Sequence, residues 1–584
     1  MAAIAASQAF AAPILVISFL LPALVAGPSF AQADGETKHR IVRVYYSDIA
    51  MGKRILISFE ASVLETNEVG GYHVLDASDA TISRLQAAGL QVQEDLLYRP
   101  RVARLLDFPC YATVEETFAS AAAIASANPN LADWTDIGDS WEKTAGLGGY
   151  DMMALVLTNE MIAGDKPKFL LTCAIHAREY TTAQLCLDFA HYLVDGYGLD
   201  ADATWLLNDH EVHIVLQANP DGRKQAEIGQ YWRKNTNQNY CGPTSSSRGA
   251  DLNRNFPFAW NCCGGSSGSG CDPTFRGSSP TSEPEAASLV DYGRMIFPDQ
   301  RGAGANDAAP ADASGVFFDL HSYGELVLWP FGYTSSPAPN GNAMQTLGRK
   351  LAFGNGYWPE QAIGLYPTDG TTDDFFYGEL GVASIAFELG TEFFQACSVY
   401  ENTIKPANLP VLLYGAKVAR TPYLTPSGPD VIGLSLSPST VLVGEDVSLS
   451  FDVDDGRFSS LNGLEPTQVI SGAEYYIDVP PWSGGQGIAL SASDGSFDSV
   501  AETVVGQIET ASLFAGRHLV FVRGQDASGQ WGAMSAAFLT VEDPAMVPAL
   551  SEEARWLAVL FLAVAVLVVA QSPGRVRSKR QAAS

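Results

Sequence analysis

The stretch that decides the fold is KFLLTCAIHARE, residues 168–179. An apolar run of strand length, 168–174, leads directly into His176-Ala177-Arg178-Glu179. An H-x-x-E spacing at a strand end or in a first helical turn can aim an imidazole and a carboxylate at one point, and a catalytic zinc site needs a third such donor. The run FFDLH, residues 317–321, ends in His321. Because the carboxyl ends of strands converge at one edge of an α/β sheet, we expect His176, Glu179 and His321 to hold one zinc ion.

Helical and strand-like segments alternate around this stretch. This alternation favours an α/β fold with a mixed, mostly parallel sheet and helices on both faces. We assign residues 110–424, which contain this alternating pattern, to one catalytic domain. The expected helices are 114–127 and 181–197, and the expected strands are 152–157, 168–174 and 211–216.

Two further units flank the expected catalytic domain. Residues 34–109 read as a small α+β unit with strands at 41–46 and 54–59 and a helix at 80–88. An arginine-rich join at 99–104 looks accessible to proteases, so we interpret 34–109 as a prosegment. Short alternating runs between Gly, Asp and Ser turns predict a β-sandwich over 425–543, with a spacer or adhesion role. Two of these runs are 447–451 and 518–522.

Both ends of the chain carry processing signals. An apolar core at 13–27 followed by Ala31-Gln32-Ala33 predicts a signal peptide over 1–33, although no Lys or Arg precedes that core. The segment 544–584 contains an apolar run, 556–570, and then a basic tail. Its 15 apolar residues fall short of the about 20 that span a bilayer. We expect a sorting segment, with an ordinary membrane anchor as the alternative, and an exported protein that is extracellular or held at the cell surface.

Composition narrows the classes of partner. The 584 residues carry a formal charge of -30, which argues against nucleic-acid binding because that function needs a basic surface. No particular oligomeric state is indicated. The eight cysteines permit disulfides in an exported protein. One or two bridges are expected in the cluster Cys241, Cys262, Cys263 and Cys271, whereas Cys173 and Cys186 are interpreted as core residues.

Five motifs combine the candidate zinc donors with further charged and polar residues. They are His176-Ala177-Arg178-Glu179, Trp232-Arg233-Lys234, Asp251-Leu252-Asn253-Arg254-Asn255, His321-Ser322-Tyr323 and Phe387-Glu388-Leu389. Their order and approximate spacing resemble those of the zinc carboxypeptidase A/B family. The resemblance covers roughly residues 110–420, and the run 261–268 resembles the bacterial carboxypeptidase T branch. The other histidines do not belong to such motifs and are expected to be structural or exposed.

The resemblance implies how a substrate is held. Asn253 and Arg254 are expected to bind the free C-terminal carboxylate, since a guanidinium fork binds a carboxylate bidentately. Tyr366 is expected to act as a mobile cap over the substrate. Arg178 and Tyr323 complete the expected substrate-binding set.

The resemblance also implies the catalytic roles. Zinc polarises the scissile carbonyl and lowers the pKa of its bound water. Glu388 is the expected general base and acid. Burying a carboxylate in the apolar run around Glu388 would cost several kcal/mol, which argues against a position with no function. Arg233 is expected to stabilise the oxyanion, and Asp251 to orient the zinc ligand His176.

Asp373 and Asp374 bear on side-chain preference. Counting from Tyr366 to Glu388 without gaps, Asp373 falls where B-type enzymes of the family carry an acid at the base of the specificity pocket. Asp374 falls on a position that is commonly Asp for structural reasons. A buried Asp373 would favour C-terminal Lys or Arg, and a solvent-facing Asp373 would carry no such preference.

The sequence therefore predicts a zinc metallocarboxypeptidase acting on peptides and proteins with a free C-terminus. Two alternatives stay open. One is an amidohydrolase of the same fold that acts on cell-wall peptides or other acylated amino acids, and the other is a non-catalytic surface binding protein.

Overall fold

The computed structural model describes residues 39–47, 51–52, 55, 59, 62–67, 71–95, 105–364 and 366–543. The expected signal peptide, the arginine-rich join and the C-terminal sorting segment lie outside the described residues. Within the described part of the chain, no helix is both long and apolar enough to cross a membrane.

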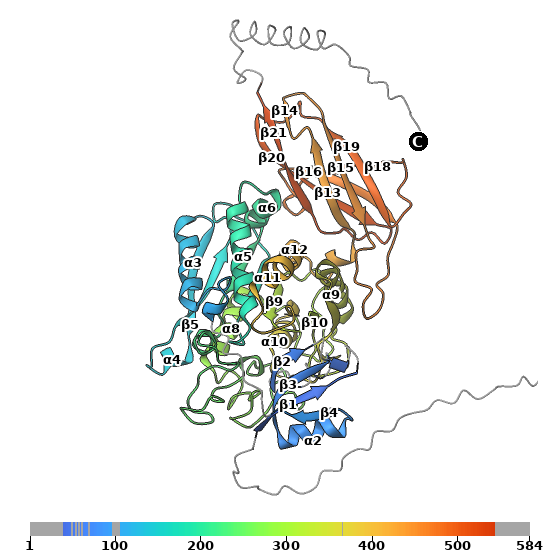
Figure 1. Ribbon diagram of the computed structural model, residues 1–584. Helices are drawn as coiled ribbons and strands as arrows, with labels where there is room; N and C mark the ends of the chain where they lie inside the picture. The colour runs from blue at the N-terminus through green and yellow to red at the C-terminus, as the bar shows by residue number, and fades with distance from the viewer. Residues whose placement is uncertain are drawn as a thin grey trace, which may run out of the picture.

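The centre of the molecule is a sheet in the order β11-β10-β12-β9-β7-β8-β6-β5 (Figure 1). Four neighbouring pairs are parallel and three are antiparallel, which confirms the mixed, mostly parallel sheet. The strands are β5 Ala132–Asp139, β6 Asp151–Leu157, β7 Lys168–Cys173, β8 Glu211–Val215, β9 Val316–His321, β10 Leu326–Trp329, β11 Trp358–Gln361 and β12 Ala383–Glu388.

Helices cover both faces of this sheet because alternate strand residues point to opposite sides. The main helices are α3 Val114–Ala127, α5 Tyr180–Gly196, α6 Ala201–Asp209, α7 Pro220–Glu227, α8 Pro284–Ile296, α9 Gly341–Asn355, α10 Thr372–Gly378 and α12 Lys405–Val418. In β7, Phe169 and Leu171 join the cluster beneath α3, α5, α9 and α12, whereas Leu170 joins the cluster beneath α8 and α10.

The N-terminal unit is built on a four-stranded antiparallel sheet, against which a nine-residue helix packs. Its order is β2-β3-β1-β4, formed by β1 His39–Tyr45, β2 Val63–Asn67, β3 Tyr72–Ser78 and β4 Gln91–Glu94, with α2 Asp79–Ala87. The strand expected at 54–59 is wrong at its two described residues, since Ile55 is helical and Phe59 lies in a turn. Ile55 is buried in the apolar cluster of this unit, so this residue fills the core without extending the sheet.

The C-terminal unit consists of two packed sheets around their own apolar core, which confirms the expected β-rich unit. Their orders are β13-β15-β19-β18 and β14-β21-β20-β16-β17. The strands are β13 Asp430–Ser437, β14 Thr440–Leu442, β15 Val447–Asp454, β16 Ile470–Ile477, β17 Ile488–Ala489, β18 Ser491–Ala492, β19 Ala501–Ile508, β20 Gly516–Asp526 and β21 Ser535–Glu542.

The sandwich packs closely against the α/β unit. The rings of Trp205 on α6 and Trp482 in the sandwich are 5.8 Å apart, and Phe521 of β20 joins the main core cluster. Lys417 on α12 pairs with Asp202 at 2.6 Å beside β21. The apolar core therefore continues from one unit into the other.

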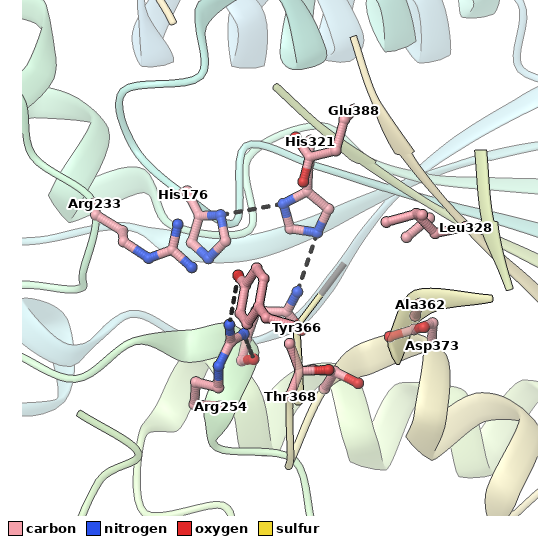
Figure 2. Close-up of a pocket in the computed structure, with 13 residues that line it drawn as sticks. His176, Arg233, Arg254, His321, Leu328, Ala362, Tyr366, Thr368, Asp373 and Glu388 are labelled. Carbon is pink, nitrogen blue, oxygen red and sulfur yellow. Dashed lines mark hydrogen bonds between the residues drawn. The ribbon is translucent and has the colours of Figure 1, made fainter. Parts of the chain in front are cut away.

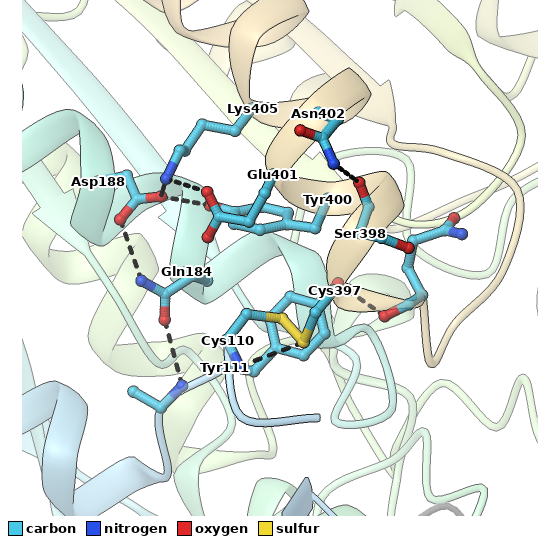
Figure 3. The surroundings of a disulfide bond; sticks show 12 residues. Cys110, Tyr111, Gln184, Asp188, Cys397, Ser398, Tyr400, Glu401, Asn402 and Lys405 are labelled. Atoms are coloured by element: carbon cyan, nitrogen blue, oxygen red, sulfur yellow. Dashed lines mark hydrogen bonds and ion pairs between the residues drawn. A yellow bond between two sulfur atoms is a disulfide. The ribbon is translucent and has the colours of Figure 1, made fainter. Parts of the chain in front are cut away.

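All eight cysteines pair as disulfides. Cys110 bridges to Cys397 across 287 residues and fastens the start of the α/β unit to the segment before α12 (Figure 3). Cys173 and Cys186 are both buried, as their interpretation as core residues expects, and they also form a disulfide with each other. The expected cysteine cluster holds two bridges, Cys241–Cys271 and Cys262–Cys263.

Candidate active site

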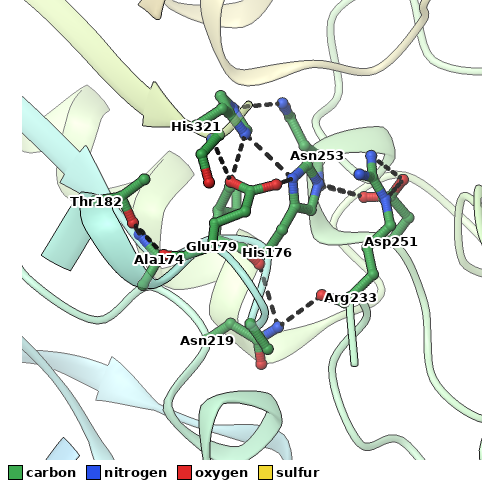
Figure 4. Close-up of polar contacts among 12 residues, drawn as sticks. Ala174, His176, Glu179, Thr182, Asn219, Arg233, Asp251, Asn253 and His321 are labelled. Carbon is green, nitrogen blue, oxygen red and sulfur yellow. Dashed lines mark hydrogen bonds and ion pairs between the residues drawn. The ribbon is translucent and has the colours of Figure 1, made fainter. Parts of the chain in front are cut away.

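The three expected zinc donors meet at the carboxyl ends of the adjacent parallel strands β7 and β9. His176 and Glu179 lie in the connection from β7 to α5, and His321 is the last residue of β9. Their ligand atoms all lie within 4.8 Å of one another (Figure 4). His176 Nδ1 is 2.8 Å from Glu179 Oε1, and His321 Nδ1 is 3.3 Å from Glu179 Oε2. The fold thus brings the predicted donors to one point.

This donor set suits zinc. Two imidazole nitrogens and one carboxylate oxygen, with room for a further ligand, are the donors of catalytic zinc sites, whereas calcium prefers oxygen alone. Burial would raise the pKa of Glu179, but the contacts with His176 and His321 outweigh burial and hold that pKa below its ordinary value. The Glu179 carboxylate is therefore ionised, which is the form that binds a cation.

Asp251 connects the zinc donors to Arg233. Its Oδ1 accepts a hydrogen bond from His176 Nε2 at 3.1 Å, which leaves His176 Nδ1 to face the other donors. Its Oδ2 accepts from Arg233 Nε and Nη2, both at 3.1 Å. Although burial opposes ionisation, Arg233 and His176 hold the pKa of Asp251 well below its ordinary value. Asp251 has the contacts expected of a residue that orients His176.

One pocket contains both zinc histidines, the expected carboxylate clamp, which is Asn253 with Arg254, and the expected general base, Glu388. Figure 2 shows Arg254, Tyr366 and Glu388 around His176 and His321. Arg233, Asn253 and Asp373 also line it, together with Leu328, Ala362, Thr368, Thr371 and Ala386. Six expected functional residues therefore line one cavity together with the two zinc histidines.

The carboxylate clamp is held in place from several sides. Arg254 donates from Nη2 to Tyr366 Oη at 3.1 Å and from Nε to the Gly265 carbonyl at 3.1 Å. Asn253 Oδ1 accepts from the Thr372 amide at 2.9 Å, which fixes the direction of its NH2 group. The tyrosine expected to cap a substrate thus lies on the arginine expected to bind the carboxylate.

Glu388 ends β12 and stands opposite His321 in the parallel register of β12 and β9. Its side chain is half-buried and lines the pocket. The apolar run before it forms the buried part of the strand, so the acid emerges at the sheet edge where the zinc donors lie.

Arg178 and Tyr323 lie outside the pocket lining. Arg178 is buried, and its guanidinium carbon lies 3.9 Å from the centre of the Phe393 ring. Tyr323 is buried against the N-terminal unit, where its hydroxyl is 2.6 Å from Thr66 Oγ1. Their expected contacts with substrate stay predictions.

Asp373 is buried at the pocket wall in α10, as the basic-preference hypothesis requires. Burial raises the pKa of its carboxyl group. Asp374 points elsewhere and accepts from the Gly332 amide at 3.0 Å, in keeping with a structural role.

The structure adds Asp319 and Asp369 to the residues expected from the sequence. Asp319 contacts His321, and Asp369 accepts backbone hydrogen bonds from Cys263 and Gly265 at 3.2 and 3.0 Å. Asp319 stands two residues before His321, and in a strand that spacing places both on one face. This signal in FFDLH could have identified it. Nothing in the sequence pairs Asp369 with a loop 104 residues away.

A mixed α/β sheet that carries a His-His-Glu metal site beside a guanidinium clamp and a carboxylate defines a class of zinc hydrolase. The chain belongs to the zinc carboxypeptidase family (peptidase M14), whose model matches residues 118–409. Zinc is accordingly the metal that His176, Glu179 and His321 are placed to hold.

Individual relatives agree with this assignment. The zinc carboxypeptidase of Saccharothrix mutabilis subsp. capreolus is 33% identical over 297 residues, which cover 48% of this chain and 63% of that protein. Carboxypeptidase A2 of Rattus norvegicus is 30% identical over 311 residues, covering 51% and 67%. The solved carboxypeptidase A from Helicoverpa armigera matches with a TM-score of 0.50 at 21% identity, and the match covers 65% of this chain and 97% of that one. At this identity the match supports the fold alone.

Proposed function

We propose that this chain is a metallocarboxypeptidase that hydrolyses the C-terminal peptide bond of peptides and proteins. The observation that carries the proposal is the single pocket in which His176 and His321 face Arg254 and Glu388. A metal site alone would fit many hydrolases. A buried guanidinium a short way from the metal donors favours substrates that end in a free carboxylate.

The clamp residues would bind and orient the substrate. Arg254 offers a planar fork for the terminal carboxylate, and Asn253 adds an amide donor. Tyr366, which now lies on Arg254 at 3.1 Å, would yield that contact to the carboxylate and cover the bound residue. The scissile bond would then lie toward His176 and His321.

Glu388 would take a proton from the attacking water and deliver it to the leaving amine. Zinc, when bound, supplies Lewis-acid polarisation of the carbonyl and acidification of water. Arg233 lines the same pocket and would stabilise the developing oxyanion, an effect worth about 3 kcal/mol in comparable sites. Asp251 would keep Arg233 and His176 oriented at the same time.

Asp373 would give the pocket a preference for C-terminal Lys or Arg. Its carboxyl group is buried at the pocket wall beside apolar Leu328 and Ala362. An incoming ammonium or guanidinium would stabilise the ionised form of Asp373, and a charge pair shielded from water is stronger than one at the surface.

The N-terminal unit would act as a prosegment. It packs on Tyr323, Leu326 and Phe393, in one apolar cluster that also contains the pocket residues Leu328 and Ala362. Cleavage in the segment 99–104 would allow it to leave. We further propose that the protein is exported through its predicted signal peptide, and is extracellular or held at the cell surface.

The test is zinc analysis of the purified chain together with a panel of peptides that differ only in their last residue. After limited tryptic cleavage, we expect one zinc per chain and release of single C-terminal residues, fastest for Lys and Arg. Internal cleavage, or no hydrolysis by zinc-loaded protein, would contradict the proposal.

A further inference from the structure

The carboxylate of Asp319 lies directly behind one of the zinc donors. Asp319 belongs to β9 and precedes His321 by two residues, so both side chains lie on the face covered by α10. It has no solvent exposure and does not line the pocket. A buried carboxylate in an apolar strand is costly unless it has a partner that uses its charge.

Its partners are both parts of the site. Asp319 Oδ2 is 3.0 Å from His321 Nε2 and accepts from Thr372 Oγ1 at 2.5 Å. Its Oδ1 is buried without a hydrogen-bond partner among the described residues. The contacts of Asp319 are therefore concentrated on the oxygen that faces His321.

The geometry of His321 fixes which nitrogen must carry the proton. Nδ1 faces the other donors, at 3.1 Å from His176 Nδ1. A metal needs the lone pair of that nitrogen, so the hydrogen must be on Nε2. Among the described residues, two groups are within hydrogen-bond distance of Nε2, namely Asp319 Oδ2 at 3.0 Å and Asn253 Nδ2 at 3.1 Å. An amide NH2 group cannot accept a hydrogen bond, which leaves Asp319 as the acceptor.

We propose that Asp319 is the positioning residue that holds His321 in the metal-binding tautomer and orientation. The proposal rests on the proposed zinc site. Asp251 contacts His176 Nε2 in the same way, so each zinc histidine has its own buried carboxylate.

Thr372 links this pair to the substrate clamp. Its hydroxyl donates to Asp319, while its backbone amide donates to Asn253 Oδ1 at 2.9 Å. Because His321 Nε2 carries its hydrogen and donates it to Asp319, this nitrogen offers no lone pair to Asn253, and the NH2 group of Asn253 stays available for a substrate carboxylate. One residue of α10 therefore orients the acceptor behind the metal ligand and the amide of the clamp together.

The experiment measures the zinc dissociation constant of the folded full-length chain by competition with a chromophoric chelator, and the visible absorption of the cobalt-loaded protein. Asp319→Asn keeps an acceptor oxygen but removes the charge, and Asp319→Leu removes both. Loss of such an outer partner weakens metal binding about 10- to 100-fold. We expect a weaker zinc affinity for Asp319→Asn, a larger loss for Asp319→Leu, and a changed cobalt spectrum for both.

Asp221→Asn is the matched control. Asp221 is equally buried, but it accepts from Ser140 Oγ at 3.0 Å and from the Glu142 amide at 2.8 Å, away from the zinc donors. We expect this variant to lower the melting temperature and to leave zinc affinity and the cobalt spectrum unchanged.

Unchanged zinc affinity in Asp319→Asn and in any folded Asp319→Leu protein would overturn the role of Asp319. If Asp319→Leu does not fold, the affinity of Asp319→Asn decides. A wild-type chain that binds no zinc would contradict the proposed function itself, whereas tight zinc binding by wild type and variants alike would contradict only this inference.

Discussion

His321 and Glu388 are register partners at the carboxyl ends of the parallel strands β9 and β12. This pairing sets a metal donor and the proposed proton-transfer group side by side on rigid backbone. Sites built on strands hold their geometry better than sites on loops, so the sheet itself fixes the separation between the metal site and the proposed base.

Replacing Glu388 by Gln should abolish proton transfer and leave the zinc donors intact. We expect kcat/KM to fall at least about 100-fold, with one zinc still bound. The measurement is hydrolysis of hippuryl-Arg alongside metal analysis. Glu379→Gln is the control, because Glu379 pairs with Arg294 at 2.6 Å and does not line the pocket. Full activity in Glu388→Gln would exclude it as the base and favour a different role for the site.

Replacing Arg254 by Lys should weaken binding of the terminal carboxylate, since Lys keeps the charge and loses the fork. The loss of a charged hydrogen bond predicts a fall in kcat/KM of about 10- to 100-fold. Steady-state kinetics would detect this fall. Arg294→Lys, on the surface, should have no such effect. An unchanged kcat/KM for Arg254→Lys would mean that the carboxylate binds elsewhere.

Replacing Asp373 by Leu should reverse the side-chain preference. We expect the ratio of kcat/KM for hippuryl-Arg over hippuryl-Phe to drop by about 10-fold or more, as loss of a charged partner predicts. The neighbouring Asp374→Asn keeps one oxygen that can accept from the Gly332 amide, so it should leave the ratio unchanged. A wild-type preference for Phe would refute the hypothesis outright.

Acid should loosen the N-terminal unit through His73. Burial lowers the pKa of His73 from 6.5 to about 4, although its hydrogen bond to the Gly52 carbonyl opposes the shift. Between these two pH values the folded unit therefore binds fewer protons than the unfolded one. The stability that the neutral His73 gives the unit is fully present above pH 6.5 and is lost as the pH falls to about 4.

His73 also reaches the α/β unit, because its Nδ1 is 2.9 Å from Thr66 Oγ1, which contacts Tyr323. We expect protease protection of residues 39–95 to decrease from pH 7 to pH 4, and His73→Gln to flatten this dependence. Protection that is the same at both pH values in wild type would contradict the role of His73.

Removing the Cys110–Cys397 bridge should destabilise the α/β unit, because the bridge closes a loop of 287 residues. A Cys110→Ser, Cys397→Ser double variant should lose about 2–4 kcal/mol of unfolding free energy. Denaturant unfolding under oxidising conditions gives the value. Equal stability would show that the packing of Tyr111 against Tyr400 already fixes these segments.

Much of the α/β unit could be predicted because its signals are local. The helix at 114–127 has the predicted bounds, and its Thr113 and Glu116 form a capping box. The zinc donors were predictable because they follow apolar strands whose ends converge. Placing His321 and Glu388 in the site required only that geometry and the family resemblance.

What could not be predicted depends on contacts between distant segments. The run at 54–59 has the apolar composition of a strand, yet Ile55 is helical because packing in the core overrides local preference. The pairing of Cys110 with Cys397 and the contact of Asp369 with Gly265 join segments that no sequence pattern relates. The position of Tyr323 under the N-terminal unit likewise follows from docking of two units.

The most direct test of the central claim compares one peptide with its C-terminal amide, using trypsin-treated, zinc-loaded protein and mass spectrometry of the products. If Arg254 and Asn253 recognise a terminal carboxylate beside the metal site, the free acid loses single residues from its C-terminus and the amide stays intact. Equal cleavage of both peptides, or cleavage of neither, would contradict the account.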